Sequence, residues 1–258
     1  PGFPPYWHYH PQLELTYIQK GSGLRFIGDH IAPFEDGDLV FVGENLPHQW
    51  VSQQSSVAAT EKAVVIQFSR SLFESFKECK PFLGLFRNAK YGLRFKDLND
   101  TFIRKLNSLP EQQPVQRLMG LLDILYDLSE DQNYELLSSI SYSEKTVLDK
   151  HQNRISAITT FIINHYDQSL SLEQMARIAG ISPPSFCRWF KQSVGKSFVH
   201  YLNTIRIEKA CQQLLQTDWP IYQIAYKSGF ESLNNFNRTF KKYKKESPRS
   251  YRKQRKIS

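Results

Sequence analysis

Four side chains near the start of the sequence belong to the residue types that bind transition metals, namely His8, His10, Glu14 and His48. Because His8 and His10 are two residues apart and Glu14 follows at two further steps of two, all three point to one face of an extended strand. Three imidazoles and one carboxylate suit Zn, Fe, Mn or Ni. The same groups also suit an organic ligand or structural hydrogen bonds, so three interpretations stay open: a divalent transition metal, an effector pocket, or a structural polar cluster.

Two further side chains could line such a pocket. Trp50 follows His48 by two residues, and its indole ring suits stacking on the apolar face of a sugar, although a core aromatic is the simpler interpretation. We therefore include His30 and Trp50 with the four residues above in the candidate effector site, with a sugar as one candidate effector.

A second group of residues suited to binding lies in the last hundred positions, where the chain repeats itself at an offset of 49 or 50 residues. In each copy a glycine supplies a left-handed turn, and a serine caps the next helix. Two phenylalanines at i and i+4 share a buried face, so the arginine between them points away from it, as a recognition helix requires. The repeat therefore predicts two helix-turn-helix units. The matched pairs are Ala176 and Ala225, Gly180 and Gly229, Ser182 and Ser232, Phe186 and Phe236, Arg188 and Arg238, Phe190 and Phe240, Lys191 and Lys241, and Tyr201 and Tyr251.

The elements that must position these groups differ between the two halves. Between residues 14 and 68, short apolar runs alternate with turn residues at the spacing typical of an all-β barrel or sandwich. After residue 69 the apolar period becomes helical, and one stripe consists of Leu118, Leu121, Leu122, Leu125 and Leu128. This stripe is either core of its own domain or a dimerisation face, and we expect a homodimer through a helix at residues 112–130.

The expected organisation is multi-domain. Residues 1–137 form the effector and dimerisation domain, with the barrel at about 1–70 and helices at about 71–137. A serine-rich linker follows at 138–150, and residues 151–258 form an all-α domain. A long helix at about 197–216 joins its two helix-turn-helix units.

Charge differs between the halves in the same way. Residues 1–150 have 15 Lys and Arg against 19 Asp and Glu, a net of −4, whereas residues 151–258 have 18 against 6, a net of +12. This asymmetry predicts a polyanion-binding unit joined to a unit with another task, although a basic solvated face is the alternative.

Other features narrow the class of protein. No apolar run approaches the roughly 18–20 residues that span a bilayer, so we expect no membrane partner and a cytoplasmic location. Cys79, Cys187 and Cys211 are odd in number and widely spaced, which predicts neither a disulfide framework nor a zinc site. The chain opens on Pro1, which suggests that a native N-terminal segment precedes it.

The run from Pro220 to Lys242 (PIYQIAYKSGFESLNNFNRTFKK) resembles the signature of the AraC/XylS family of transcription regulators, and the run from Leu172 to Ser182 resembles its first helix-turn-helix. The resemblance is close from Ile155 to Tyr251. One departure is Lys245, where the family usually has a helix-ending glycine. For the first half the resemblance implies a cupin-like β-barrel that binds an effector, and the histidine and glutamate spacing also resembles that of metal-binding cupins.

The resemblance also assigns DNA contacts by position. It implies base contacts from Pro184, Cys187 and Arg188 in the first unit, and from Leu233, Asn234, Asn235 and Arg238 in the second. Arginine suits guanine and asparagine suits adenine, so we expect the second unit to recognise more sequence. We assign Lys191, Lys196, Lys241 and Lys242 to phosphates. For Lys244, Lys245 and residues 252–256 we expect solvated charges.

These observations predict a sequence-specific DNA-binding transcription regulator that senses a small-molecule effector, with double-stranded DNA, the effector and a second copy as partners and RNA polymerase as a further candidate. The alternative is a metal-dependent cupin enzyme with a nucleic-acid-binding tail. We expect no enzyme, because no separate acid-base or nucleophile set accompanies the four candidate ligands. A constitutive architectural DNA binder would leave the barrel unexplained.

Overall fold

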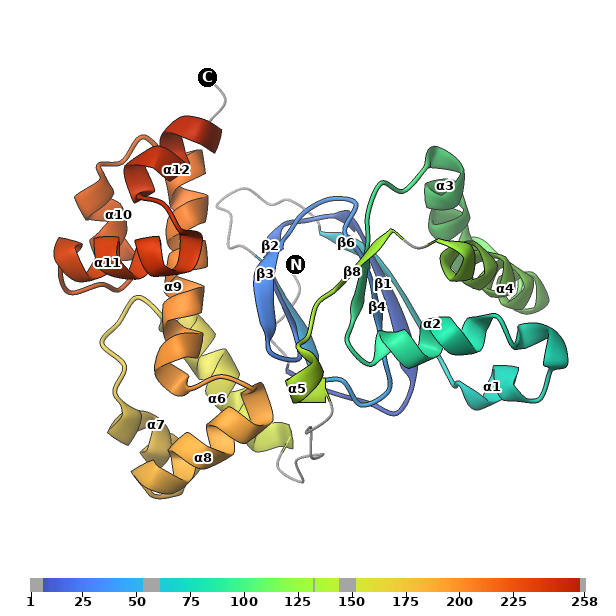
Figure 1. Ribbon diagram of the computed structural model, residues 1–258, viewed down its shortest axis with the longest axis horizontal. Helices are drawn as coiled ribbons and strands as arrows, with labels where there is room; N and C mark the ends of the chain where they lie inside the picture. Colours follow the sequence, from blue (N-terminus) through green and yellow to red (C-terminus); the bar gives the residue numbers. More distant parts are fainter. Residues whose placement is uncertain (1–6, 53–60, 132, 144–151, 256–258) are drawn as a thin grey trace. The chain divides into compact units, whose positions relative to one another are not determined.

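The computed structural model describes residues 7–52, 61–131, 133–143 and 152–255, which fall into two units, residues 1–148 and 149–258 (Figure 1). The first unit contains the strands and several helices, and the second is helical. None of the helices in these ranges is both long and apolar enough to cross a membrane.

Two antiparallel sheets form the centre of the first unit, with the strand orders β6-β1-β4-β7-β8 and β3-β2-β5. The strands are β1 (Leu13–Lys20), β2 (Gly23–Ile27), β3 (His30–Phe34), β4 (Leu39–Val42), β5 (His48–Ser52), β6 (Lys62–Phe68), β7 (Leu93–Phe95) and β8 (Tyr134–Leu136). Within the described residues no ladder of paired strands joins the two sheets. The predicted all-β region followed by helices is confirmed, but the expected closed barrel is a pair of open sheets.

The alternation along β1 decides what each face of the larger sheet contacts. Leu13 and Leu15 belong to a core shared with the helices, which cover that face in Figure 1. Glu14 and Thr16 point the other way, and Ile18 on that side packs in a second core with Ile27 of the smaller sheet. The polar residues of β1 therefore lie between the two sheets.

The helices of the first unit are α1 (Ser71–Glu74), α2 (Phe82–Ala89), α3 (Asp100–Ser108), α4 (Pro114–Glu130) and α5 (Ile140–Ser143), with 3₁₀ turns at Lys77–Cys79 and Leu109–Glu111. Asn99 caps α3 by accepting a 2.9 Å hydrogen bond from the Phe102 backbone, and α4 begins at Pro114, a residue suited to the first helical turn. The expectation of helices alone at 71–137 is wrong, because β7 and β8 lie in this range and extend the larger sheet.

Residues 138–143 are packed against the sheets, although we expected a linker there. The Ser138 hydroxyl and the Ser139 backbone and hydroxyl donate to the Asp29 carboxylate at 2.8–3.0 Å. Tyr142 is buried in the core between the sheets. The serines thus fix this segment through hydrogen bonds to Asp29. A serine-rich sequence looks the same whether its hydroxyls make such bonds or face solvent in a linker. Residues 144–150 of the expected linker lie outside the described residues.

The second unit is built around one long helix, α9 (Phe198–Gln216), ten of whose residues are buried. The others are α6 (Gln152–Asn164), α7 (Leu172–Ala179), α8 (Pro183–Val194), α10 (Ile221–Lys227), α11 (Leu233–Lys244) and α12 (Pro248–Arg255). Helices α7 and α8 form one helix-turn-helix pair and α10 and α11 form the other.

Candidate functional site

The turns of both helix pairs have the predicted left-handed glycines. Gly180 ends α7 at φ +67°, and Gly229 follows α10 at φ +84°. The serine caps differ: Ser232 accepts from the Asn235 backbone at 3.2 Å, whereas the Ser182 hydroxyl donates to the Ser185 hydroxyl at 3.0 Å. A side-chain cap at Ser182 was therefore a wrong expectation. Prolines occupy the first two positions of α8, so that end has fewer backbone N–H groups to cap.

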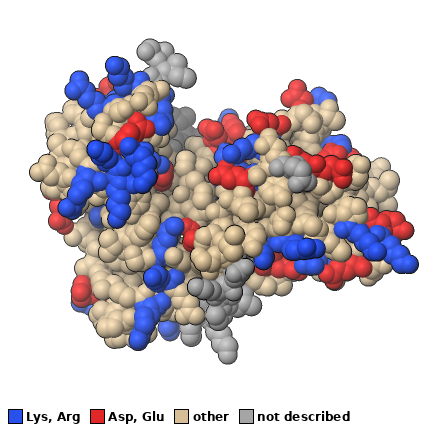
Figure 2. Space-filling model, viewed as in Figure 1, with Lys and Arg blue, Asp and Glu red and all other residues tan. Residues whose placement is uncertain are grey.

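The recognition helices α8 and α11 have one buried and one exposed face. Phe186, Phe190, Phe236 and Phe240 are fully buried, which fixes the rotation of each helix. Of the residues assigned to DNA, Pro184, Cys187, Arg188, Lys191, Asn234, Asn235, Arg238, Lys241 and Lys242 are exposed, and Leu233 and Lys196 are half-buried. Figure 2 shows Lys and Arg side chains gathered over the part of the second unit that carries α11.

Two contacts modify the expected chemistry of α11. The Asn235 side-chain oxygen accepts from Arg238 at 3.4 Å and from Thr239 at 3.3 Å, so Arg238 leans back toward Asn235 along the helix. Both bonds are long and exposed, and a base edge can replace them at little cost.

Several basic residues near the end of the chain are structural. Lys244, expected to be solvated, pairs with Glu208, and Arg252 donates to the carbonyls of Leu214 in the last turn of α9 and of Trp219 beyond it. Arg255 pairs with Glu246 at 2.6 Å. The expectation of solvated charge is therefore wrong for Lys244 and Arg252, because each reaches an acceptor more than 30 residues away in the sequence, whereas Arg255 is 44% exposed and remains a surface charge. Lys256 lies outside the described residues.

Lys245 forms the helix cap that glycine usually forms. It adopts φ +65°, and its N–H donates to the Lys241 carbonyl at 2.9 Å, as Gly195 at φ +76° donates to Lys191. The departure from the family pattern therefore leaves the geometry of this cap unchanged.

In the first unit the structure brings together His8, His10, Glu14 and His48, with one ligand atom of each within 4.8 Å of all the others. The cause is backbone pairing: the His8 N–H donates to the His48 carbonyl at 3.2 Å, and the His48 N–H donates back at 2.8 Å. The chain ahead of β1 is thereby held against β5 of the smaller sheet.

Glu14 is the centre of this cluster. Its Oε2 lies 3.0 Å from His10 Nε2 and 3.5 Å from His48 Nε2, and Gln67 Nε2 donates to it at 2.8 Å. The Thr16 hydroxyl donates to the other oxygen at 2.7 Å. Burial alone would raise the pKa of Glu14, but His10, His48 and Gln67 hold it well below its usual range. The bond to Glu14 raises the pKa of His10 in turn, against the effect of burial.

The other two candidate effector residues, Trp50 and His30, lie in different places relative to this cluster. Trp50 lies beside the cluster, with its ring centroid 5.8 Å from that of His48, and its buried Nε1 has no hydrogen-bond partner among the described residues. His30 is outside the cluster and instead acts on Glu135, whose pKa is lowered chiefly by Lys96 and also by His30.

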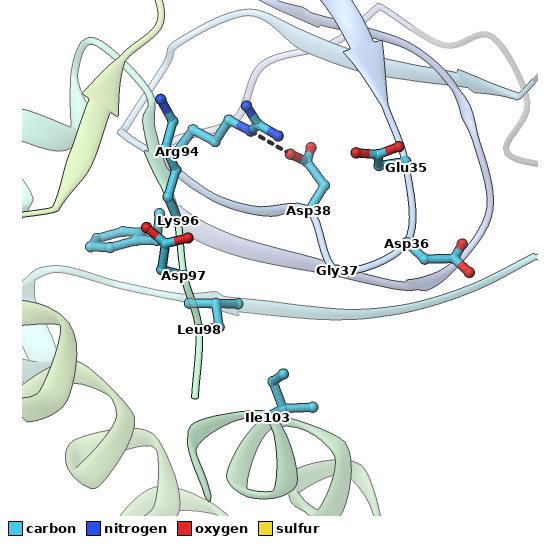
Figure 3. A pocket seen from close by; sticks show the side chains of 10 residues that line it. Glu35, Asp36, Gly37, Asp38, Arg94, Lys96, Asp97, Leu98 and Ile103 are labelled. Atoms are coloured by element: carbon cyan, nitrogen blue, oxygen red, sulfur yellow. Dashed lines mark hydrogen bonds and ion pairs between the residues drawn. The ribbon is translucent and has the colours of Figure 1, made fainter. Parts of the chain in front are cut away.

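Sequence reasoning missed Gln67, which pairs directly across the sheet with Glu14. It also missed a charged pocket of about 370 Å³ in the first unit (Figure 3). There the buried Asp38 accepts from Arg94 Nε at 2.7 Å and from the buried Arg25. Gln67 lies in an apolar run, and the residues of the pocket come from separate segments, so neither has a local sequence signal.

The donor chemistry of the cluster fits a transition metal ion. His10 Nδ1 lies 3.1 Å from the Gln12 carbonyl, and His48 Nδ1 lies 2.7 Å from the Leu46 carbonyl. Each Nδ1 can donate its proton to the carbonyl, so each Nε2 can turn a lone pair toward an ion; at His10 the ion would replace the Nε2–H that now bonds to Glu14.

The two helix-turn-helix pairs, each with an exposed arginine on its second helix, define a protein of the double helix-turn-helix, DNA-binding class. A helix-turn-helix domain family matches residues 175–254. An uncharacterised HTH-type transcriptional regulator of Staphylococcus aureus (strain MSSA476) is 34% identical over 251 residues, which are 93% of this chain and 31% of that protein. The HTH-type transcriptional regulator YdeC of Bacillus subtilis (strain 168) is 23% identical over 257 residues, 95% of this chain and 85% of that one.

Among solved structures, the C-terminal domain of AraT, a response regulator from Geobacillus stearothermophilus, is 37% identical with a TM-score of 0.41 and covers 43% of this chain and 92% of that one. Residues 175–254 therefore form an AraC-type helix-turn-helix domain, and the chain as a whole is similar to HTH-type transcriptional regulators. It spans about a third of the length of the S. aureus relatives it matches.

Proposed function

We propose that the chain is a cytoplasmic transcription regulator that binds double-stranded DNA at specific sequences. The observation that carries this proposal is the pair of recognition helices, α8 and α11, each exposing an arginine opposite two buried phenylalanines. The 19-residue α9 between them is about 28 Å long, close to the roughly 34 Å of one turn of B-DNA. The two helices then enter successive major grooves on one side of the duplex.

The two recognition helices contribute unequally in this proposal. Helix α11 offers Asn234, Asn235 and Arg238 to base edges, whereas the exposed face of α8 offers Arg188 beside Pro184 and Cys187. The lysines toward the end of each helix, Lys191 and Lys241 with its neighbour Lys242, bind phosphates and set the register.

The first unit then senses a small organic effector between its two sheets. The region combines apolar side chains of both sheets with polar groups, including the unpartnered Trp50 Nε1. A buried donor without a partner costs about 1–3 kcal/mol, so a ligand that accepts from it gains affinity. A sugar hydroxyl stacked against the indole ring is the effector chemistry that we favour.

The regulator is a homodimer through α4 in this proposal. The face with Leu121, Leu125 and Leu128 packs into the core of its own unit. A different face exposes Val115, Met119 and Tyr126, which are 55–72% exposed and follow the i, i+4, i+11 positions of a heptad seam. Leu121, Leu125 and Leu128 of the leucine stripe are therefore core, whereas Leu118 is 42% exposed, and we assign the second copy to the exposed stripe.

Selection of genomic DNA fragments by the purified full chain tests the DNA assignment. The selected fragment and a base-shuffled fragment of equal length are compared by fluorescence anisotropy at one stated salt concentration. We expect at least 10³-fold tighter binding to the selected fragment, in the usual range for specific sites. Equal affinity for both fragments contradicts the proposal. Binding in the presence of single monosaccharides, with Trp50→Phe as the matched variant, tests the effector assignment separately.

A further inference from the structure

We propose that His8, His10, Glu14 and His48 bind one divalent transition-metal ion of the zinc, manganese, iron or nickel class, and that Gln67 supplies a fifth ligand. The inference goes beyond the proposed function, which assigns no metal to the first unit and places DNA binding in the second unit. Its failure would leave DNA binding by the second unit untouched.

The spacing of the donor atoms carries the first step. Metal–ligand bonds of about 2.0–2.2 Å separate any two donors of one ion by no more than about 4.4 Å. The four ligand atoms lie within 4.8 Å of one another, so shifts of a few tenths of an ångström place them around one centre. The ring centroids of His8 and His10 lie 4.3 and 5.1 Å from that of His48, which allows three imidazoles to converge.

The tautomers carry the second step. Metal-binding histidines usually donate their other ring N–H to a carbonyl or carboxylate, which fixes the ring and raises its basicity. His10 and His48 make such contacts through Nδ1, to the Gln12 and Leu46 carbonyls. The backbone therefore orients both Nε2 atoms toward Glu14 before any ion arrives.

A buried atom without a partner carries the third step. His48 is 1% exposed, and its Nε2 has no hydrogen-bond partner among the described residues, because the 3.5 Å to Glu14 exceeds a good bond. An ion gives this lone pair a ligand bond. A purely structural cluster would leave it unsatisfied at the cost of a buried polar atom.

Gln67 completes the site from the solvent side. Its Nε2 lies 2.8 Å from Glu14 Oε2 and 3.2 Å from His10 Nε2. An N–H pointing at an ion is repelled, but a half-turn of the amide presents Oε1 in nearly the same position. The exposed Gln67 therefore leaves a path from solvent and serves as the fifth ligand.

Equilibrium dialysis of the tag-free, chelator-treated full chain against Zn²⁺, Mn²⁺ or Ni²⁺, followed by elemental analysis, tests the proposal. We expect one ion per chain, with affinity lowered at least 10-fold by His48→Ala or Glu14→Gln and unchanged by His30→Ala, the matched histidine outside the cluster. A molar ratio of metal to chain well below one overturns the proposal. Equal metal affinity in His48→Ala and in the unchanged chain also overturns it.

Gln67→Glu keeps the test decisive where the alanine variant fails to fold. It places a second carboxylate against Glu14, so the ion-free variant should melt at a lower temperature than the unchanged chain. Added metal should raise its melting temperature more than that of the unchanged chain, because the new ligand is anionic. If metal changes the melting temperature of neither Gln67→Glu nor the unchanged chain, the proposed site is wrong. If metal raises the melting temperature of His48→Ala as much as that of the unchanged chain, the ion binds elsewhere and the proposal is also overturned.

Discussion

Lys244 Nζ lies 2.6 and 2.8 Å from the two carboxylate oxygens of Glu208, which joins the end of α11 to the middle of α9. The side chains are 21% and 10% exposed, so the pair is largely shielded from water. Because α11 is the second recognition helix, this ion pair helps to fix the helix that carries Asn234, Asn235 and Arg238 relative to the rest of its unit.

Removal of the Lys244 charge should destabilise the second unit. Lys244→Met keeps the apolar stem but leaves the Glu208 carboxylate without its partner, at a cost of about 1–3 kcal/mol in the free energy of unfolding. The exposed Lys242→Met is the matched control and should change stability by less than about 0.5 kcal/mol. Urea unfolding followed by circular dichroism measures both.

A double-mutant cycle isolates the pair. Lys244→Met combined with Glu208→Gln should cost less than the sum of the two single changes, because the second change removes the carboxylate that the first one strands. Strictly additive costs would show that the two side chains do not interact in solution.

Replacement of Lys245 by glycine should stabilise the protein. Lys245 holds φ +65°, a conformation in which a Cβ atom costs roughly 1 kcal/mol. Lys245→Gly should therefore raise the free energy of unfolding by up to about 1 kcal/mol, reduced by the greater entropy of glycine in the unfolded chain. Lys245→Ala removes the same charge without relieving the backbone, so stabilisation by alanine as well would point to charge rather than to φ.

How far the sequence predicts the molecule depends on the range of the interaction. The two helix-turn-helix units follow from local patterns, since the turn at Gly180 and the Phe186–Phe190 pair each involve residues within one helix or turn. The Glu14–Gln67 pair depends on the register between β1 and β6. The Glu208–Lys244 pair depends on the packing of α9 against α11, because the two residues are 36 positions apart in the sequence. Such contacts have no local signal, so sequence reasoning missed both.

The short strands were missed, and the orientation of the α4 helix was left open, for a related reason. Strands β7 and β8 have three residues each, too few to show an alternating period. The leucines of α4 mark an apolar stripe, but the pattern does not show whether that stripe faces its own sheet or another chain. The four residues of the polar cluster were predicted as a set, because their residue types are distinctive even though β5 had to bring His48 to the others.

Arg238 and Lys242 should affect DNA binding in different ways. Arg238→Ala should cost about 1–3 kcal/mol on the selected fragment and relax selectivity at one base position. Lys242→Ala should weaken binding to selected and shuffled DNA alike, and should reduce the slope of log K against log salt by about 1. Titrations at several salt concentrations measure both quantities, and equal losses on the two fragments for both variants would refute the assignment.

A charge on the exposed face of α4 should dissociate the homodimer that we propose. Met119 is 64% exposed and lies between Val115 and Tyr126 on that face. In a symmetric dimer Met119→Glu places two like charges in one apolar seam, so we expect the dissociation constant to rise at least about 100-fold, from two changes of roughly 1.4 kcal/mol or more. Leu72→Glu, at another exposed apolar position on α1 (46% exposed), should leave the dimer intact. Analytical ultracentrifugation of each variant over a range of concentrations measures the constant, and a Met119→Glu protein that stays as dimeric as the Leu72→Glu protein would place the interface elsewhere.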